Sequence, residues 1–218
     1  LYIRDPSGFS VINHNDMWVP NFFFKFNEDG EVNDVLFIDY QMPHFNSPGI
    51  DLNFLFYGAL NEETRIFKVK KLLRIYHEVL RDTLAALNYP KPIPTLHDIH
   101  VEVLKTGLNS LIASFCEVPL LMVEHSDDLN MDLSLGSSET AEKFRYTLFN
   151  NEKYKNFIQK LLIEFDELGY LDWKVEKCLF LEKLYWYVSN YLIMQRTKGN
   201  FTYISHHHYY KLIINLSA

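Results

Sequence analysis

The helical spacing of apolar residues in the middle of the chain constrains the fold more than any other feature. Within residues 61–87, apolar side chains recur in steps of three or four residues: Ile66, Val69, Leu73, Tyr76, Leu80, Leu84 and Leu87. This period places them on one face of a single α-helix, and Asn61 is suited to cap its first turn. Similar patterns predict further helices over residues 51–60, 95–115, 138–149 and 152–168. We therefore expect a mainly α-helical chain.

A short β-structured segment precedes these helices. Residues 21–26 are rich in aromatic side chains, residues 27–30 are Asn-Glu-Asp-Gly, and residues 35–38 form a second apolar run. Two apolar runs on either side of a turn sequence predict a β-hairpin. The expected fold class is mainly α with a small β-hairpin, that is, α+β.

Composition excludes several classes of protein. The 218 residues are 48% hydrophobic and 22% charged, with a net charge of −7, so non-specific binding to nucleic acid is not expected. No basic run indicates a membrane surface, and the most apolar late stretch, residues 178–194, is too short and too interrupted by charge to span a bilayer. Two cysteines make no disulfide framework, which favours a reducing, cytoplasmic location.

One polar pattern is typical of phosphoryl transfer. His14, Asp16 and Asn21 follow the spacing H-x-D-x-x-x-x-N, and Asp39 ends the second strand of the expected hairpin. Phosphoryl transfer needs an oriented hydroxyl and cations that neutralise the phosphates. Asp16 is suited to accept the hydroxyl proton, while Asn21 and Asp39 offer the oxygen ligands that Mg²⁺ prefers. The bare spacing also fits a capped loop with solvated acids, and its position before a hairpin favours the catalytic interpretation.

Three segments resemble the catalytic part of ecdysteroid-kinase-like proteins, which are relatives of choline kinases with a protein-kinase-like fold. They are VINHNDMWVPNFFFKF (residues 11–26), DVLFIDYQ (34–41) and SPGIDLNFLFYGAL (47–60). The resemblance implies ATP and Mg²⁺ as cofactors, with Asp16 and His14 in the catalytic motif and Asn21 and Asp39 as metal ligands. It also implies that Asp51 supports the catalytic loop from the helix below, although Asp51 also suits a helix N-cap.

The resemblance departs from the family pattern at two positions and has limits along the chain. Asn15 stands where the family usually has Gly, and Pro20 precedes Asn21. The resemblance implies that residues 1–172 form the C-terminal catalytic lobe, with the N-terminal lobe absent, so we expect this fragment to bind ATP weakly and to transfer phosphate poorly. Residues 173–218 lie outside the resemblance and are expected to be either a docking helix or a misjoined sequence.

The acceptor is the most open part of the functional prediction. The resemblance implies a small-molecule alcohol as substrate, either an ecdysteroid or a related lipophilic alcohol. Choline, ethanolamine and xenobiotic alcohols are alternatives, and a catalytically dead, kinase-like binding module is an alternative of another class. Five aromatic residues fit either the core of the hairpin, which we expect for most of them, or a cleft for a flat acceptor: Trp18, Phe22, Phe23, Phe24 and Phe26.

Overall fold

The computed structural model describes residues 4–123, 133 and 136–171, and the chain divides into two compact units, residues 1–114 and 115–218. Each unit is treated by itself. The predicted boundary at residue 172 coincides with the end of the described residues, so it stays a prediction. The described part is mostly helical with two small antiparallel sheets, which confirms the α+β class and is consistent with a kinase-like fold.

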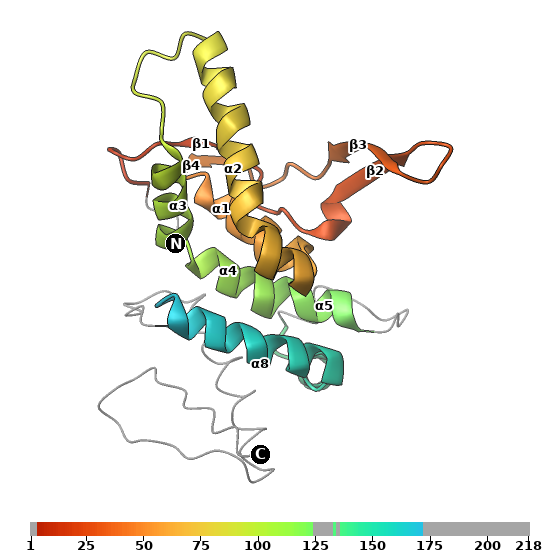
Figure 1. The fold of residues 1–218 in the computed structure, drawn as a ribbon. Coiled ribbons are helices and arrows are strands. Elements are labelled where there is room, and N and C mark those ends of the chain that lie inside the picture. The colour runs from red at the N-terminus through yellow and green to blue at the C-terminus, as the bar shows by residue number, and fades with distance from the viewer. Residues whose placement is uncertain (1–3, 124–132, 134–135, 172–218) are drawn as a thin grey trace, which may run out of the picture. The chain divides into compact units, whose positions relative to one another are not determined.

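Two strand pairs open the first unit (Figure 1). Strand β1 (Val11–Asn13) pairs antiparallel with β4 (His44–Asn46). The two ends of the intervening segment, residues 14–43, therefore lie next to each other. Between them, β2 (Phe22–Phe26) and β3 (Val32–Phe37) form the predicted hairpin. The side chain of Asn27 accepts hydrogen bonds from the backbone of Asp29 and Glu31, which closes the turn.

The aromatic residues of the hairpin do not form a core, and this expectation is wrong for most of them. Phe23, Phe24 and Phe26 are 60%, 44% and 59% exposed, and Leu36 on the partner strand is 63% exposed. A two-stranded ribbon has too few strands to bury either of its faces alone. The hairpin therefore presents a large apolar surface next to the loop that carries Asp16 and Asn21.

The helices of the first unit follow β4 in sequence. Helix α1 (Gly49–Phe54) continues into the π-helical segment η2 (Leu55–Ala59), and α2 (Glu62–Ala86) begins after Asn61. The side chain of Asn61 accepts a hydrogen bond from the backbone of Thr64, as predicted for its N-cap. Of the apolar row in α2, only Leu73 is fully buried, and the residues at its two ends, Ile66 and Leu87, are exposed.

The helix predicted over residues 95–115 is broken into pieces. Helix α3 (Leu96–Lys105) begins at a capping box of Thr95 and Asp98 and ends before Gly107, where α4 (Leu108–Ile112) begins. Asn53 of α1 holds this break, because its amide nitrogen donates to the carbonyl of Val103 at 2.9 Å and its oxygen accepts from Ser110 at 2.8 Å. The sequence pattern missed the break because both pieces are apolar.

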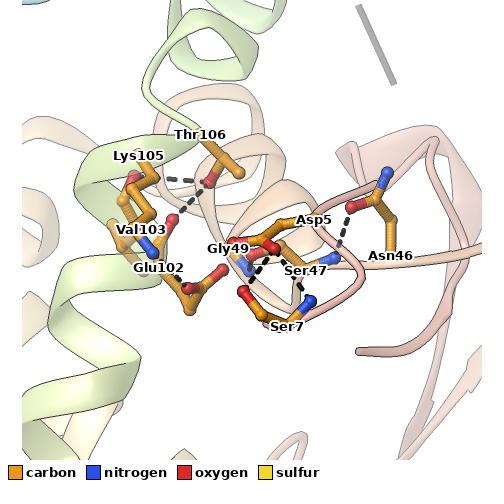
Figure 2. A network of polar contacts seen from close by, with 9 residues as sticks. All are labelled: Asp5, Ser7, Asn46, Ser47, Gly49, Glu102, Val103, Lys105 and Thr106. Atoms are coloured by element: carbon orange, nitrogen blue, oxygen red, sulfur yellow. Dashed lines mark hydrogen bonds and ion pairs between the residues drawn. The ribbon is translucent and has the colours of Figure 1, made fainter. Parts of the chain in front are cut away.

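Gly49 allows α1 to approach α3 closely (Figure 2). A Cβ atom at this position would overlap the carbonyl oxygen of Glu102 and Oγ1 of Thr106. The backbone N–H of Gly49 donates to Oγ of Ser47, which orients the chain as it enters α1. The glycine therefore lets α1 pack where Asp51 can point towards the loop before β2.

The second unit is helical in its described residues. The π-helical segment η3 (Ala113–Glu117) crosses the boundary between the units and is followed by α5 (Val118–Met122), α7 (Glu139–Phe149) and α8 (Glu152–Glu167). Ser138 and Asn151 cap α7 and α8 with their side chains, and Gly169 ends α8 at a φ of 72°, close to the predicted boundaries. Pro119 lies in the first turn of α5 instead of following a helix. The core contains Tyr154, Ile158, Leu161 and Phe165.

Candidate active site

The loop after β1 is fixed by one carboxylate from α1. The backbone N–H of His14 donates to Oδ2 of Asp51 at 2.6 Å, and the N–H of Asn15 donates to Oδ1 at 2.7 Å. Asn15 has a φ of 67°, in the left-handed region that Asn adopts more readily than most residues. Asn therefore keeps the sharp turn at the position where the resembling family usually has Gly.

The charge state of Asp51 is governed by competing effects. Burial raises the pKa of its carboxyl above the ordinary value, while the two loop N–H groups and the nearby His14 and His44 lower it. Tyr76 of α2 lies on the other side, and its burial together with the Asp51 carboxylate raises the pKa of its phenol to about 12. The phenol is therefore neutral at physiological pH and adds no second charge to this buried region.

Two asparagines that the sequence did not single out support the loop from behind. Asn13 is fully buried, and its amide nitrogen donates to the carbonyl of Asn46 at 3.2 Å. Its oxygen accepts from the N–H of Asp51 at 3.4 Å, which links β1 to the start of α1. The sequence gave no signal for Asn13 and Asn46, because the hydrogen bond between them joins residues 33 positions apart.

Asp16 and Asn21 lie together, as their spacing suggested. The amide nitrogen of Asn21 donates to Oδ2 of Asp16 at 2.8 Å and to the carbonyl oxygen of the same residue at 2.9 Å. A single 3-10 turn, η1 (Val19–Asn21), brings Asn21 back to Asp16, and Pro20 fits its first positions. Asn21 is buried and Asp16 is half-buried, so the pair faces solvent mainly through the carboxylate.

Asp39 is brought beside this pair by the hairpin. The N–H of Ile38 donates to the carbonyl of Asn21 at 3.0 Å, which extends the β2–β3 pairing by one residue to the point where Asp39 follows. Asp39 has a φ of 63° and is exposed, with only a long contact of 3.3 Å from the Gln41 amide. The carboxylate is therefore available at the end of the strand.

His14 connects the loop to the second strand. Its Nε2 lies 2.7 Å from the carbonyl oxygen of Ile38, and because a carbonyl can only accept, Nε2 carries the proton. The ring of Tyr40 packs against the imidazole, with 4.5 Å between the ring centroids. His14 is buried and holds the strand end, so the geometry gives it a positioning task and places Asp16 nearer to solvent.

The side chains of Asn21 and Asp39 carry the type of oxygen donor that Mg²⁺ prefers. The Asn21 amide nitrogen is committed to Asp16, so its oxygen faces away and is suited to a cation, and Asp39 adds one exposed carboxylate. Mg²⁺ is commonly bound through one or two carboxylates together with phosphate oxygens and water. Among the described residues no cluster of three or more His, Cys, Asp and Glu could hold a metal alone. His206–His208 lie outside the described residues.

No helix in the described ranges is both long and apolar enough to cross a bilayer. In a comparison with protein families, residues 1–89 match the model of the Ecdysteroid kinase-like family. No curated protein and no solved structure matches the chain. The matched range contains His14, Asp16, Asn21, Asp39 and Asp51 together with the whole of α2. Residues 1–89 of this chain are therefore similar to the ecdysteroid kinase-like family, in agreement with the resemblance of the three segments.

Proposed function

We propose that this chain carries the catalytic segment of an ATP- and Mg²⁺-dependent phosphotransferase that acts on a hydroxyl group of a small lipophilic alcohol, such as an ecdysteroid. The family match supports kinase-like chemistry in general. The observation that carries the proposal is the hydrogen bond from the Asn21 amide to the Asp16 carboxylate, next to the end of β3, which Asp39 follows by two residues.

In this proposal Asp16 is the catalytic base. One of its carboxylate oxygens is held by Asn21, which leaves Oδ1 to accept the proton of the attacking hydroxyl group. The proton moves from the acceptor oxygen to Asp16 as that oxygen bonds to the γ-phosphorus of ATP, while the bond from this phosphorus to the β–γ bridging oxygen breaks and ADP leaves. The amide of Asn21 prevents rotation of the carboxylate, so the second oxygen keeps one direction towards the substrate.

The remaining residues have supporting roles in the proposal. Asn21 and Asp39 would hold Mg²⁺, which neutralises phosphate charge when it is bound. Asp51 fixes the loop through the N–H groups of His14 and Asn15, and His14 fixes the carbonyl of Ile38. These four residues act by placing groups, so only Asp16 takes part in moving a proton.

The apolar surface of the hairpin supports a lipophilic acceptor. Phe23 and Leu36 are paired across the two strands and are both about three-fifths exposed. Along the chain, Phe23 lies two residues from Asn21 and Leu36 lies three residues from Asp39. Choline, ethanolamine and xenobiotic alcohols remain the alternative acceptors. We further propose that the reaction takes place in the cytoplasm, where thiols stay reduced and the two cysteines need no pairing.

The first test measures phosphate transfer from Mg·ATP to a panel of these alcohols by the intact enzyme that carries this segment and by its Asp16→Asn variant, because we expect the 218-residue chain alone to transfer phosphate poorly. We expect Asp16→Asn to lower the rate by roughly 10²- to 10⁴-fold, the usual loss for a positioned general base. Asp29→Asn is the matched control, because Asp29 lies in the exposed hairpin turn and should leave the rate unchanged. A loss below about fivefold in Asp16→Asn would show that Asp16 is structural.

A catalytically dead binding module is the second candidate, and nucleotide binding separates it from the enzyme. Titration calorimetry of the intact enzyme with ATP is expected to show binding that needs Mg²⁺ and that weakens in Asp39→Asn, whereas the 218-residue chain alone is expected to bind ATP weakly. Binding without transfer to any acceptor would favour the module. Nucleotide binding with the same Mg²⁺ dependence in Asp39→Asn would remove Asp39 from the metal site.

A further inference from the structure

The outer side of α2 carries a dense group of basic residues. Between Thr64 and His77 the helix has no acidic residue, and this stretch contains five of the 21 Lys and Arg residues of a chain with a net charge of −7. Lys68, Lys70, Lys71 and Arg74 are all exposed. At a rise of 1.5 Å per residue, these four lie within about 9 Å of helix length.

Two apolar side chains lie among these bases. Phe67 is 76% exposed and Ile75 is 46% exposed. At 100° per residue, Phe67, Lys71 and Ile75 follow one another at steps of four along one line, with Lys70 and Arg74 on one side and Lys68 on the other. We call Phe67, Lys68, Lys70, Lys71, Arg74 and Ile75 the basic face of α2.

The basic residues of this face are not engaged in ion pairs with other described residues. In the described part of the chain, none of Lys68, Lys70, Lys71 and Arg74 forms an ion pair, whereas Arg81 in the next turns pairs with Asp82 at 2.8 Å. The opposite side of the helix is the packed side, where Leu73 is buried. Solvent is therefore the present neighbour of four positive charges and an exposed phenyl ring.

We infer that the basic face of α2 docks on an anionic lipid surface. Lys and Arg near a negatively charged membrane are attracted to it, and their long aliphatic stems let the charges reach headgroups while the helix lies flat. Phe67 and Ile75 then insert between the headgroups, as apolar residues do in interfacial helices. An acidic protein surface would also satisfy the charges and cover the phenyl ring, so the test below includes it as the alternative outcome.

This inference is independent of the proposed phosphotransfer. None of the six residues belongs to the site around Asp16, and docking requires neither nucleotide nor metal. The bases are spread over residues 68–74 of the chain, and α2 brings them to one side of the helix. The two proposals can therefore fail separately.

Vesicle co-sedimentation of the 218-residue chain tests the inference. We expect binding to an equimolar mixture of phosphatidylserine and phosphatidylcholine at about 0.1 M salt, weaker binding as salt rises, and none to phosphatidylcholine alone. Lys70→Gln/Lys71→Gln should lower the partition coefficient roughly 25-fold, about fivefold for each lost charge. Lys91→Gln/Lys153→Gln removes the same charge from exposed positions elsewhere and should change little.

The apolar part of the inference has its own variant. Phe67→Ala should weaken binding at every salt concentration, and Leu87→Ala, which shortens another exposed apolar residue outside the face, should not. Circular dichroism of each variant checks that α2 is still folded. The inference is overturned if the chain does not bind the anionic vesicles, or if both double variants bind them equally. It is also overturned if polyglutamate displaces the chain from anionic vesicles as effectively as an excess of the same vesicles does, which would indicate an acidic protein partner.

Discussion

At the scale of single residues, Asp51 decides the shape of the candidate catalytic loop. Its two oxygens accept hydrogen bonds from the backbone N–H groups of His14 and Asn15, which lie in a turn outside any helix or strand. A buried N–H without an acceptor costs about 1–3 kcal/mol. The carboxylate thus stabilises a loop geometry that the local sequence does not favour by itself.

Replacement of Asp51 by Asn is expected to lower the free energy of unfolding at neutral pH by about 1–3 kcal/mol. The Asn side chain has only one acceptor oxygen, so one of the two loop N–H groups would face an amide nitrogen. Urea unfolding followed by circular dichroism measures the change, with Asp29→Asn as the control at an exposed position.

The pH dependence of stability gives a second readout for Asp51. Because burial raises the pKa of Asp51 in the folded chain, the unfolded chain loses this proton at lower pH. Between the ordinary value of 3.8 and the raised folded value, the folded state binds more protons, so the contribution of Asp51 to the free energy of unfolding falls as pH rises. This fall should be missing in Asp51→Asn, and an identical pH profile in both proteins would contradict the assignment.

At the scale of elements, the approach of α1 to α3 sets the position of Asp51. The approach depends on Gly49, because any side chain there would overlap Glu102 and Thr106. Asn53, one turn further along α1, binds the end of α3 and the start of α4. One short helix therefore carries both the support for the loop and the contact that fixes the helix break at Gly107.

Gly49→Ala is expected to destabilise the chain by about 1–3 kcal/mol, the usual cost of overpacking. The atoms in the way are mainly backbone of α3, which cannot move aside without shifting the helix. Gly8→Ala is the control, because an added Cβ there meets only ordinary contacts at 3.5 Å or more. Thermal unfolding of the two variants compares them, and equal midpoints would show that α1 and α3 can separate without cost.

At the scale of the whole molecule, the chain divides into two compact units. The second unit contains Cys116, and burial together with the adjacent Glu117 carboxylate raises the pKa of this thiol to about 12. The thiolate is the reactive form, so the folded unit should protect Cys116 from alkylation.

We expect iodoacetamide to label Cys116 in the folded chain roughly a thousandfold more slowly than in urea, because few molecules carry the thiolate at pH 8. Mass spectrometry of the Cys116 peptide measures the rate separately from Cys178. Labelling at the same rate with and without urea would mean that the second unit opens freely under native conditions.

The sequence by itself determined the local features of this protein. The hairpin, the long helix after Asn61, the capping box at Thr95 and the stop at Gly169 all depend on residues within a few positions of one another. The pairing of Asp16 with Asn21 also follows from their five-residue separation. Short-range chemistry of this kind is written in the spacing of the residues, so it needs no knowledge of distant contacts.

Only the tertiary structure decided the rest. The tie between Asp51 and the loop joins residues more than 35 positions apart, and the break before α4 is held by Asn53 more than 50 positions away. The sequence also assigned the hairpin phenylalanines to a core, whereas their exposure depends on whether another element covers the ribbon. Burial is a property of everything that packs around a residue, so it cannot be derived from the residue and its neighbours in sequence alone.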